Sequence, residues 1–410
     1  MAENPLSEQG RGVDDLVAVE LRARLDLLAS LGAALNAAAA ELVVAAGADI
    51  GTPRRVATIE LRLATAHLQT MNEEVPYVRG KDPYGTVAAI FPYDAAPVML
   101  ARVGGAAVLG GNVFRFSFSS QTPRTAALLA ELVAPYKSFQ PNLTLDNRAF
   151  GAACVADPRV QVLFISGGGE VGRQYARRAD NFAKLFFAGP SGMPAAILAA
   201  DSPVATAARY VLRRAFINGG QYCTTLKKAY IAAPIYEAVK EVLLDLLPEM
   251  KVGEPQDPEV WIGPLKVPHT RQLLQAALSR LQQATYLTAP DFAGEYIRPI
   301  ICEVPDVPDL EMFGPFLALI KVKDVNEAIS RAVRTRYPFA VSLFGSAPAT
   351  QLQFLRQTFG MVYLNPDFTF TPLRLPFGGK KDSGWILEKQ NSRLVRREGA
   401  FIYSAELVRP

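Results

Sequence analysis

The feature that most constrains this chain is a repeated alternation of short apolar runs with amphipathic, helix-like runs. Apolar runs that end at turn residues indicate strands buried on both faces, and the helices between them supply the cover. The alternation therefore predicts an α/β fold with parallel, doubly wound sheets. The predicted strands are 85–91, 112–118, 160–166, 227–231, 317–322 and 339–344. The predicted helices are 95–109, 123–133, 171–179, 203–217, 235–247, 269–283 and 325–335.

The length of 410 residues exceeds what one ordinary core encloses, so we expect two domains. The strand and helix pattern places the first at residues 1–74 and 85–189 and the second at residues 190–395. Residues 75–84 and 399–410 have an extended pattern, and no helix is expected after them. They predict a small β arm that pairs with a partner subunit in a homodimer or homotetramer.

Composition excludes several classes of function. A net charge of +4, spread thinly, gives no reason to expect a nucleic-acid surface. No apolar run reaches membrane-spanning length, and the N-terminus does not resemble a signal peptide. The only histidines, His67 and His269, are too few for a Ser-His-Asp triad or a histidine-rich metal site. Cys154, Cys223 and Cys302 form no CxxC pair, which favours a reducing cytoplasm.

One cysteine, Cys223, directly follows a glycine-rich turn at the end of the helix-like run 203–217. Gly219 and Gly220 allow a sharp turn and a close approach to a bound molecule. A thiol is an effective nucleophile as its thiolate, where a carbonyl group can reach it. The alternative is a buried cysteine in an ordinary helix-to-strand loop.

A second glycine-rich segment follows the apolar run that ends at Ser166. The run Gly167-Gly168-Gly169-Glu170-Val171-Gly172 fits a G-x-G-x-x-G pattern between a strand and a helix. Such a loop directs free N–H groups and the positive end of a helix at one point, which is what a pyrophosphate requires. The alternative is a turn that serves only to reverse the chain.

Several segments together resemble those of the NAD(P)-dependent aldehyde dehydrogenase superfamily. Residues 218–223 resemble its N-x-G-Q-x-C nucleophile segment, residues 311–315 its E-[IM]-F-G-P segment, and residues 376–384 match P-F-G-G-x-K-x-S-G. Residues 110–112 with 122–123, and residues 165–172, resemble two further motifs. The order and spacing hold from about Pro83 to the C-terminus, whereas the first eighty residues do not match.

The resemblance implies an NAD(P)-binding, Rossmann-like first domain, a catalytic second domain and an oligomerisation arm. It implies that the Cys223 thiolate attacks an aldehyde, that hydride passes to NAD or NADP, and that the resulting thioester is released. It makes Glu311 a partner of the nicotinamide ribose and places Phe313 against the cofactor. The residues that it assigns to catalysis are Cys223, Asn218, Asp94 and Glu388, and those that it assigns to the cofactor are Pro92, Ser166, Gly167, Gly168, Gly172, Glu311 and Phe313.

Three functional positions depart from the family pattern. Asp94 stands where the family has an oxyanion-binding asparagine, and an ionised carboxylate there would repel the oxyanion unless it were protonated. The run Gly189–Met193 contains no general-base glutamate. Ser117 replaces the ribose-binding lysine, and Arg115 on the same strand face is expected to form an ordinary salt bridge rather than to reach the cofactor.

These departures leave several functions open. Hydrolysis of a thioester needs an activated water, so the missing glutamate favours transfer of the acyl group to coenzyme A, or reduction of an acyl thioester. Hydrolytic oxidation stays open with Glu388 as the base, although Glu388 and Lys381 could equally form an exposed pair. An altered or inactive homologue that acts as a partner subunit, or as a non-redox enzyme, is the alternative. A thioesterase-like hydrolase is disfavoured by the shortage of histidine.

The sequence leaves the substrate and the choice between NAD and NADP open. No cluster of basic residues near Cys223 indicates a carboxylate or phosphate handle. Tyr93, Tyr222 and Phe370 are candidates for an apolar aromatic pocket, or for ordinary core positions.

Overall fold

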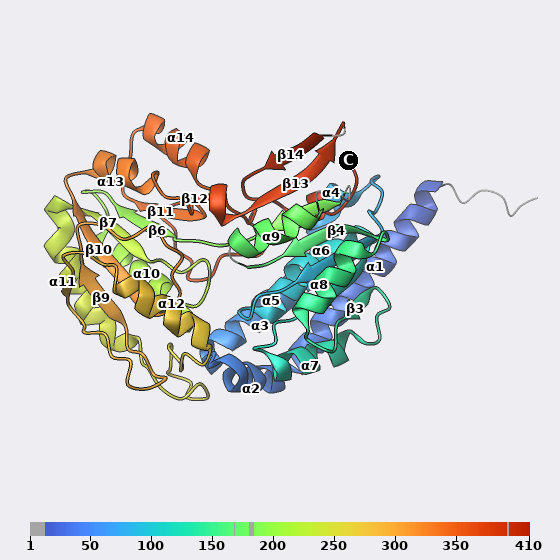
Figure 1. Cartoon of the computed structure of the whole chain (residues 1–410), viewed down its shortest axis with the longest axis horizontal. Helices are drawn as coiled ribbons and strands as arrows, with labels where there is room; N and C mark the ends of the chain where they lie inside the picture. Colours follow the sequence, from blue (N-terminus) through green and yellow to red (C-terminus); the bar gives the residue numbers. More distant parts are fainter. Residues whose placement is uncertain (1–12, 168, 180–183, 392) are drawn as a thin grey trace, which may run out of the picture.

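Within the residues that the computed structural model describes (13–167, 169–179, 184–391 and 393–410), the chain forms two seven-stranded sheets. The strand order is β14-β13-β5-β4-β1-β2-β3 in the first sheet and β12-β11-β6-β7-β10-β9-β8 in the second. Figure 1 shows the two sheets side by side, with the second on the left. The predicted α/β fold is confirmed.

In the first sheet, β1 to β5 are parallel, and an antiparallel hairpin extends the sheet beyond β5. The middle strand of the parallel part is β1, four of whose five residues are buried, as expected for a strand between two helical layers. The strands are β1 (Thr86–Ile90), β2 (Val113–Ser117), β3 (Phe139–Pro141), β4 (Val160–Ile165), β5 (Leu185–Ala188), β13 (Trp385–Gln390) and β14 (Arg393–Arg397).

The second sheet is parallel except for the short strand β8, which runs antiparallel to β9. The chain crosses into it from β5 through Gly189 and Pro190. Its strands are β6 (Ala195–Leu198), β7 (Lys228–Ala232), β8 (Thr285–Tyr286), β9 (Ile300–Glu303), β10 (Phe316–Val322), β11 (Ala340–Phe344) and β12 (Met361–Leu364).

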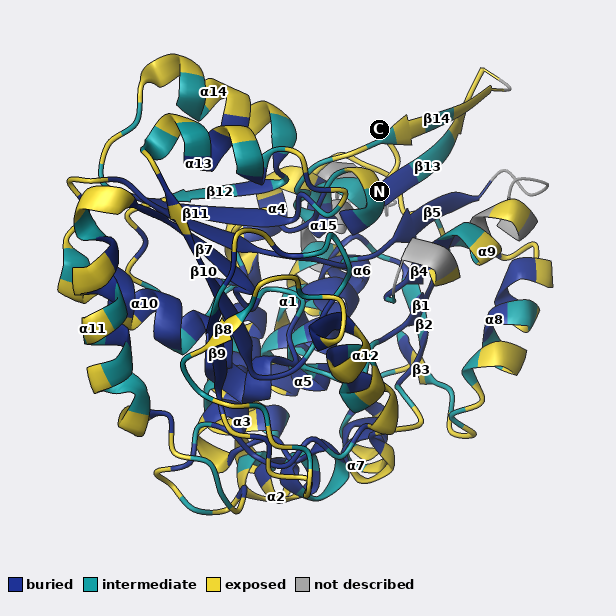
Figure 2. Ribbon diagram, turned by 60° about the vertical axis from the view of Figure 1, so that its left-hand side comes forward, coloured by how far each residue is buried: buried dark blue, intermediate teal, exposed yellow. Residues whose placement is uncertain are grey.

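Helices cover both faces of each sheet. Neighbouring residues of a strand point to opposite faces, so each contacts a different helical layer. Val87 of β1 packs with α1, α3, α6 and α7, whereas Ala88 packs with α8 and α9. In the second sheet, Ala195 packs with α12 and α13, and Ala196 with α10 and α11. Figure 2 shows the central strands of both sheets buried and the strands β8 and β14 exposed, with half-exposed helices around the sheets.

The elements that connect the strands are mostly those predicted. The α-helices are α1 (Val13–Ala37), α2 (Ala39–Ile50), α3 (Arg54–Gln69), α4 (Val75–Val78), α5 (Ala96–Met99), α6 (Gly105–Leu109), α7 (Pro123–Val133), α8 (Asn147–Ala156), α9 (Gly169–Ala179), α10 (Val204–Phe216), α11 (Tyr236–Leu246), α12 (Pro268–Leu278), α13 (Val325–Ala332), α14 (Ala349–Thr358) and α15 (Tyr403–Glu406). Shorter helical turns are η1 (Met71–Glu74), η2 (Leu100–Gly104), η3 (Ile217–Gly220), η4 (Ala233–Ile235), η5 (Leu247–Glu249) and η6 (Lys381–Ser383).

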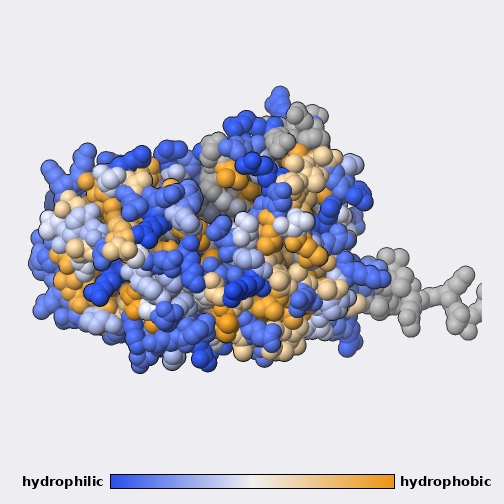
Figure 3. All heavy atoms as spheres, turned by 60° about the horizontal axis from the view of Figure 1, so that its bottom comes forward, coloured by the Kyte–Doolittle hydropathy of each residue, from blue (hydrophilic) through white to orange (hydrophobic). Residues whose placement is uncertain are grey.

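No single described helix is long and apolar enough to cross a membrane, although the bent pair Glu20–Ala37 and Ala39–Ile50 meets that criterion by length and composition. Both helices of the pair pack in the core of the first domain, through residues such as Leu28 and Leu42. The face drawn in Figure 3 mixes hydrophilic and apolar residues.

The extended arm predicted at residues 75–84 and 399–410 is wrong. The first segment begins with α4, and the second contains α15. Tyr403 and Leu407 are four residues apart, so they share one helical face, and both are buried in the core of the first domain. The two segments lie side by side, joined by a bridge between Pro83 and Val408 and by a hydrogen bond that the Arg409 N–H donates to the Asp82 carbonyl at 2.8 Å.

The assignment of residues up to 395 to the second domain is also wrong at its end. β13 pairs with β5 and therefore belongs to the first sheet, together with β14. Trp385 of β13 packs on Phe186 of β5, with ring centroids 5.6 Å apart. Trp385, Ile386 and Leu387 at the start of β13 are all apolar and pack on both faces of the sheet, which explains why the chain returns to that edge.

Candidate active site

Cys223 is presented by a turn that a glycine-rich sequence is needed to form. Where η3 follows α10, Asn218, Gly219 and Gly220 have φ values of 51°, 61° and 69°. Left-handed backbone of this kind is strained for residues that carry a Cβ atom. At Gly220 a Cβ would also lie 2.0 Å from the carbonyl oxygen of Gly314, so a side chain is excluded there.

Lys227 joins this turn to the loop that carries Glu311. Its ammonium donates hydrogen bonds to the carbonyl oxygens of Gly220 (2.7 Å) and Gly314 (3.0 Å). The Gly314 N–H also donates to the Gly220 carbonyl at 3.0 Å. Lys227 is 1% exposed, and burial lowers its pKa to about 7. In the sequence, the only indication of a role for Lys227 was its charge at the start of the apolar run 227–231.

The thiol opens into a cavity of about 1290 Å³ that residues from both domains line. It lies where β1 and β4 end, which is the edge at which open α/β sheets bind ligands. Most of the predicted site residues share this one cavity: Pro92, Asp94, Ser166, Gly167, Cys223, Glu311 and Phe313. The three aromatic candidates, Tyr93, Tyr222 and Phe370, line it as well.

Asn218 and Gly172 do not line the cavity. Asn218 is buried in the turn behind the thiol, and both polar atoms of its amide lack a hydrogen-bond partner. Gly172 lies within α9, where a Cβ would stand 2.8 Å from that of Ala188, so this glycine allows the helix to pack closely on β5. Gly168 lies outside the described residues.

Glu388 is not part of the cavity. It lies on β13, forms an ion pair with Arg397 at 3.1 Å and accepts a hydrogen bond from Gln390. The exposed pair considered for Glu388 and Lys381 does not form either, because the Lys381 ammonium donates to the Thr335 carbonyl at 3.0 Å. The return of β13 to the first sheet removes Glu388 from the thiol, so its assignment to catalysis is wrong.

The cavity disfavours the charged forms of the thiol and of its neighbouring carboxyl groups. Burial, Asp94 and Glu311 together raise the pKa of Cys223 well above its ordinary value. Burial raises the pKa of Asp94 to about 7, and the negative charge of Glu311 adds to this rise. Burial also raises the pKa of Glu311, although contacts with the Ser191 side chain and the Gly192 N–H oppose the rise.

Two buried arginines, Arg102 and Arg214, line the same cavity, so the expectation of no basic cluster near Cys223 is wrong. Both guanidinium groups lower the pKa of the thiol, although less than its other surroundings raise it. No described carboxylate lies within ion-pair distance of either arginine, and the Nε atom of each lacks a hydrogen-bond partner. Arg102 lies in η2 and Arg214 on α10, far apart in the chain, so the sequence alone did not indicate that they share a cavity.

The two arginines differ in how many of their N–H groups donate hydrogen bonds. Arg214 donates to the carbonyl oxygens of Thr369 (2.7 Å) and Thr224 (2.9 Å), which fixes the loop beside Cys223. Arg102 lies 4.0 Å from the centroid of the Phe377 ring and donates to the Pro372 carbonyl at 3.4 Å. Arg102 therefore has the greater donor capacity left for a ligand.

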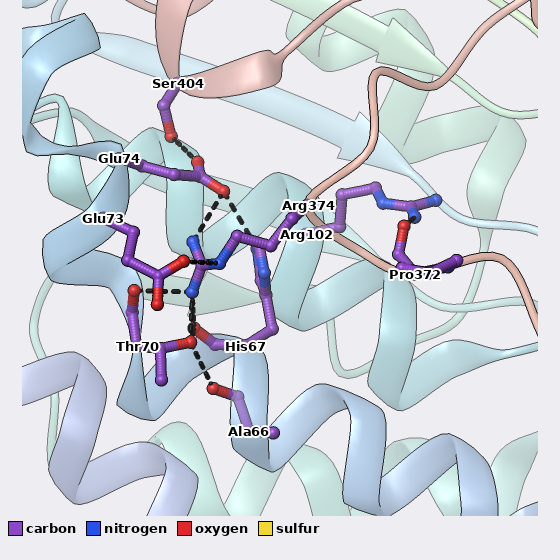
Figure 4. A network of polar contacts seen from close by, with 9 residues as sticks. All are labelled: Ala66, His67, Thr70, Glu73, Glu74, Arg102, Pro372, Arg374 and Ser404. Carbon is purple, nitrogen blue, oxygen red and sulfur yellow. Dashed lines mark hydrogen bonds and ion pairs between the residues drawn. The ribbon is translucent and has the colours of Figure 1, made fainter.

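A polar network holds the loop that supports Arg102. Arg374 forms ion pairs with Glu73 at 2.8 Å and Glu74 at 3.2 Å, and the buried Ser404 hydroxyl donates to Glu74. Figure 4 shows this network beside Arg102, with side chains from η1, α15 and the loop converging on Glu74. The C-terminal segment thus fixes one wall of the cavity rather than projecting from the fold.

A third carboxyl group in the described cavity wall, beside Asp94 and Glu311, was missed. Glu60 of α3 is 5% exposed and accepts a hydrogen bond from the Tyr222 hydroxyl, next to the nucleophile. It lies in the segment where the sequence showed no resemblance, so no motif indicated it. The only indication in the sequence was a single acidic residue among the apolar residues of segment 54–69. Ordinary surface helices show the same pattern.

The cofactor end of the cavity fits a dinucleotide. The Ser166 hydroxyl, at the end of β4 and before the N-terminus of α9, is buried without a hydrogen-bond partner. The cavity continues past it to Asn147 and Tyr175 on α8 and α9. An unpartnered donor beside a helix N-terminus is suited to an anionic pyrophosphate.

The position of the missing ribose lysine is closed. Ser117 is fully buried and its hydroxyl accepts a hydrogen bond from Asn142 at 3.0 Å. Arg115 forms the expected salt bridge, with Asp157 at 3.0 Å. No cluster of three or more histidine, cysteine, aspartate or glutamate side chains in the described part of the chain could hold a metal ion.

A glycine-rich turn that carries a cysteine, a glycine-rich strand end and an E-M-F-G-P loop lie around one cavity, the arrangement that the sequence resemblance assigns to an NAD(P)-dependent dehydrogenase. The model of the aldehyde dehydrogenase family matches residues 10–395, so the chain belongs to that family. It is an NAD(P)-dependent oxidoreductase of the aldehyde dehydrogenase type. Because the match begins at residue 10, the prediction that the first eighty residues fall outside the resemblance is wrong.

Relatives cover most of the chain at low identity. A lactaldehyde dehydrogenase from Methanococcus vannielii is 24% identical, over 82% of this chain and 77% of its own length. An N-succinylglutamate 5-semialdehyde dehydrogenase from Ectopseudomonas mendocina is 28% identical, over 89% and 80%. The NADP-dependent glyceraldehyde-3-phosphate dehydrogenase from Bacillus halodurans superposes with a TM-score of 0.80 at 21% identity, over 95% and 90%.

Proposed function

We propose that this protein oxidises a small aldehyde that carries a carboxylate group, through an acyl intermediate on Cys223, with NAD or NADP as the electron acceptor. The observation that supports this proposal is the single cavity that Cys223 shares with Asp94, Glu311 and the arginines. The acyl group then passes to water or to coenzyme A.

Asp94 is the group in the cavity best suited to take the thiol proton. Its pKa of about 7 leaves a substantial ionised fraction at neutral pH, whereas the Cys223 thiol is protonated. Once it holds the proton, Asp94 is a neutral donor that can bond to the oxygen gaining charge on the substrate. This sequence of states avoids the repulsion expected for an ionised Asp94. A bound nicotinamide would supply the acceptor for the hydride.

Arg102 and Arg214 support a carboxylate on the substrate. A buried guanidinium without an ionic partner is costly, and an anionic ligand would offset that cost with charge-assisted hydrogen bonds. Two relatives carry the names N-succinylglutamate 5-semialdehyde dehydrogenase and probable succinate-semialdehyde dehydrogenase, which describe acidic aldehydes. Arg102 is the proposed anchor, because fewer of its donors are engaged.

The test is a comparison of aldehydes with and without a carboxylate. Succinate semialdehyde, lactaldehyde and propanal are each mixed with NAD⁺ or NADP⁺, in the presence and absence of coenzyme A, and reduced cofactor is followed by absorbance. We expect the highest kcat/KM for the acidic aldehyde and no turnover in Cys223→Ala. Full turnover in that variant would contradict the assignment of Cys223. Dependence of the rate on coenzyme A would identify it as the acyl acceptor.

A second candidate is a homologue that has lost dehydrogenase chemistry and serves as a binding partner or a non-redox enzyme. The raised pKa of Cys223 and the acid at position 94 favour it, because neither is arranged for an activated thiolate. Dinucleotide binding, measured by thermal shift and fluorescence, separates the two candidates. Absence of binding to both dinucleotides would support the second.

We further propose a cytoplasmic homo-oligomer. The three cysteines are all free, and none is placed to bridge another. Light scattering on purified protein, and fractionation of cells that produce it, test the two parts of this proposal.

A further inference from the structure

The carboxyl group of Glu60 occupies an unusual place for an acid. α3 brings it from the N-terminal segment into the wall of the cavity that contains Cys223. The Tyr222 hydroxyl donates to its Oε1 atom, and the Tyr222 backbone leads directly into the nucleophile. A buried carboxyl group against an active-site cavity is more often functional than structural.

The surroundings of Glu60 are largely apolar. Val56 of its own helix, Ile217 and Phe370 form the apolar cluster around Tyr222. The titratable groups that act on Glu60 are Tyr222, from the nucleophile loop, and Asp94, from the loop after β1. The cations Arg102, Arg148 and Arg214 and the imidazole of His269 line other parts of the same cavity. No described cation forms an ion pair with Glu60.

Acyl release to water needs a base that the usual family position does not supply. The run Gly189–Met193 has no carboxyl group, and Glu388 lies outside the cavity. Three carboxyl groups remain in the described cavity wall. Glu311 contacts Ser191 and Gly192 on the cofactor side. Asp94 is already assigned to the thiol proton, which leaves Glu60.

We propose that Glu60 is the general base that activates water for hydrolysis of the acyl group on Cys223. This inference rests on the proposed function, since it needs an acyl intermediate at that sulfur. The Glu60 carboxylate accepts one proton from a water molecule as the water oxygen bonds to the thioester carbonyl carbon. The carbon–sulfur bond then breaks, a carboxylic acid leaves, and the sulfur regains its electron pair. No oxidant or reductant takes part in this step.

The pH dependence of acyl release has a definite sign. Burial is the main cause that raises the pKa of Glu60, to about 8, and the charge of Asp94 adds to it, while the bond from Tyr222 opposes the rise. A base acts in its ionised form, so acyl release should accelerate as pH rises through about 8. Glu60→Gln keeps an oxygen that can accept the Tyr222 bond but cannot take a proton. Measurements on this variant therefore distinguish a role of Glu60 as a base from a role in positioning the loop alone.

The experiment uses 4-nitrophenyl acetate, which acylates a reactive thiol without a dinucleotide. Release of nitrophenolate reports acylation of Cys223 in a burst, and the steady rate that follows reports hydrolysis of the acyl group. In Glu60→Gln we expect an unchanged burst, a steady rate lower by roughly 100-fold, and loss of the inflection near pH 8. Intact-mass measurement should show an acetyl group that persists on the enzyme. Hydroxylamine, a neutral nucleophile, should restore turnover.

Glu388→Gln is the comparison, because it removes the carboxylate that the sequence suggested as base. Slow acyl release in Glu388→Gln with normal release in Glu60→Gln would overturn the proposal. A burst and a steady rate that fall together in Glu60→Gln would show positioning alone and would also overturn it. If aldehydes produce no reduced cofactor while the ester still acylates Cys223, the proposed dehydrogenase function fails and the assignment of Glu60 is still decided.

Discussion

The turn that presents Cys223 and the cavity wall that faces it are built by different means. The turn is a backbone structure, in which Gly220 and Gly314 approach each other too closely for side chains and Lys227 binds both carbonyl oxygens. The wall is formed by side chains. Its charged groups come from separate elements: Glu60 from α3, Arg102 from η2, Arg214 from α10 and Asp94 from the loop after β1.

This difference separates two kinds of constraint. The position of the thiol depends on main-chain geometry that few sequences can form, whereas the charges around it depend on single side chains that can be exchanged within the same fold. The turn retains the family residues, and the wall has changed at Asp94 and in the run Gly189–Met193. Changes in the turn should therefore affect folding and activity together, and changes in the wall should alter the dependence on pH and substrate.

The largest effect is expected for Gly220→Ala. The new Cβ would overlap the Gly314 carbonyl oxygen at 2.0 Å, on a backbone with φ of 69°. We expect a loss of about 3–4 kcal/mol in the free energy of unfolding, together with loss of activity. Urea unfolding and the burst of acylation measure the two effects. Gly219→Ala is the matched control, because its φ is 61° but the nearest atom to the new Cβ lies 3.8 Å away. It should cost about 1 kcal/mol, and equal losses in both variants would contradict the role of the close approach.

The next largest effect is expected for Asp94→Asn. The amide can still donate to an oxyanion but cannot accept the thiol proton, so kcat/KM should fall by about 100-fold or more. In the unaltered protein activity should rise with pH through about 7, because the ionised form of Asp94 is the base; the variant should lose that inflection. The exposed Asp367→Asn serves as control and should keep the profile. An unchanged pH profile in Asp94→Asn would assign proton removal to another group.

The sequence predicted the turn better than the wall, and the reason is physical. Glycines at 219 and 220 before a cysteine restrict the local backbone directly, so Cys223 could be found from neighbouring residues alone. Glu60 and Arg102 reach the cavity only because helices from distant segments pack together, and a single sequence does not specify that packing. The strand and helix order was predictable for the same local reason.

The errors at the C-terminus have a related origin. The last residues lack a long periodic pattern, and a helix as short as α15 is set by its contacts with the core rather than by its own sequence. The placement of Glu388 failed because β13 pairs with β5, a strand about two hundred residues earlier in the chain.

A smaller effect is expected for Arg102→Met, which retains most of the side-chain volume and removes the charge. We expect kcat/KM for succinate semialdehyde to fall by about 50-fold, through KM, because a charge-assisted hydrogen bond contributes about 1.5–3 kcal/mol. Propanal should lose far less, since it has no carboxylate and is affected only through the pKa of the thiol. Arg102→Lys should recover part of the loss. An equal fall for both aldehydes would indicate that Arg102 supports the fold of the cavity instead.

The smallest effect is one on stability, and it concerns Glu60→Gln. Folding raises the pKa of Glu60 from 4.5 to about 8, so the folded state favours the protonated acid. The contribution is therefore fully present below the unfolded pKa and is lost as pH rises towards 8. Between pH 6 and pH 8 the unaltered protein should lose about 2 kcal/mol relative to the variant, which stays neutral at every pH. Urea unfolding of both proteins at several pH values measures the difference.

The control for this last prediction is Glu41→Gln on α2, where the carboxyl group is exposed and should give no such slope. Identical pH profiles for Glu60→Gln and the unaltered protein would mean that the carboxyl group is ionised in the fold at neutral pH, with a counter-charge from elsewhere in the cavity. Arg102 is one of the cations that line that cavity, so the single variant Arg102→Met, which keeps Glu60, should then restore the slope if Arg102 supplies the counter-charge and leave it absent if it does not. That result decides whether the wall acts as separate groups or as one coupled charge cluster.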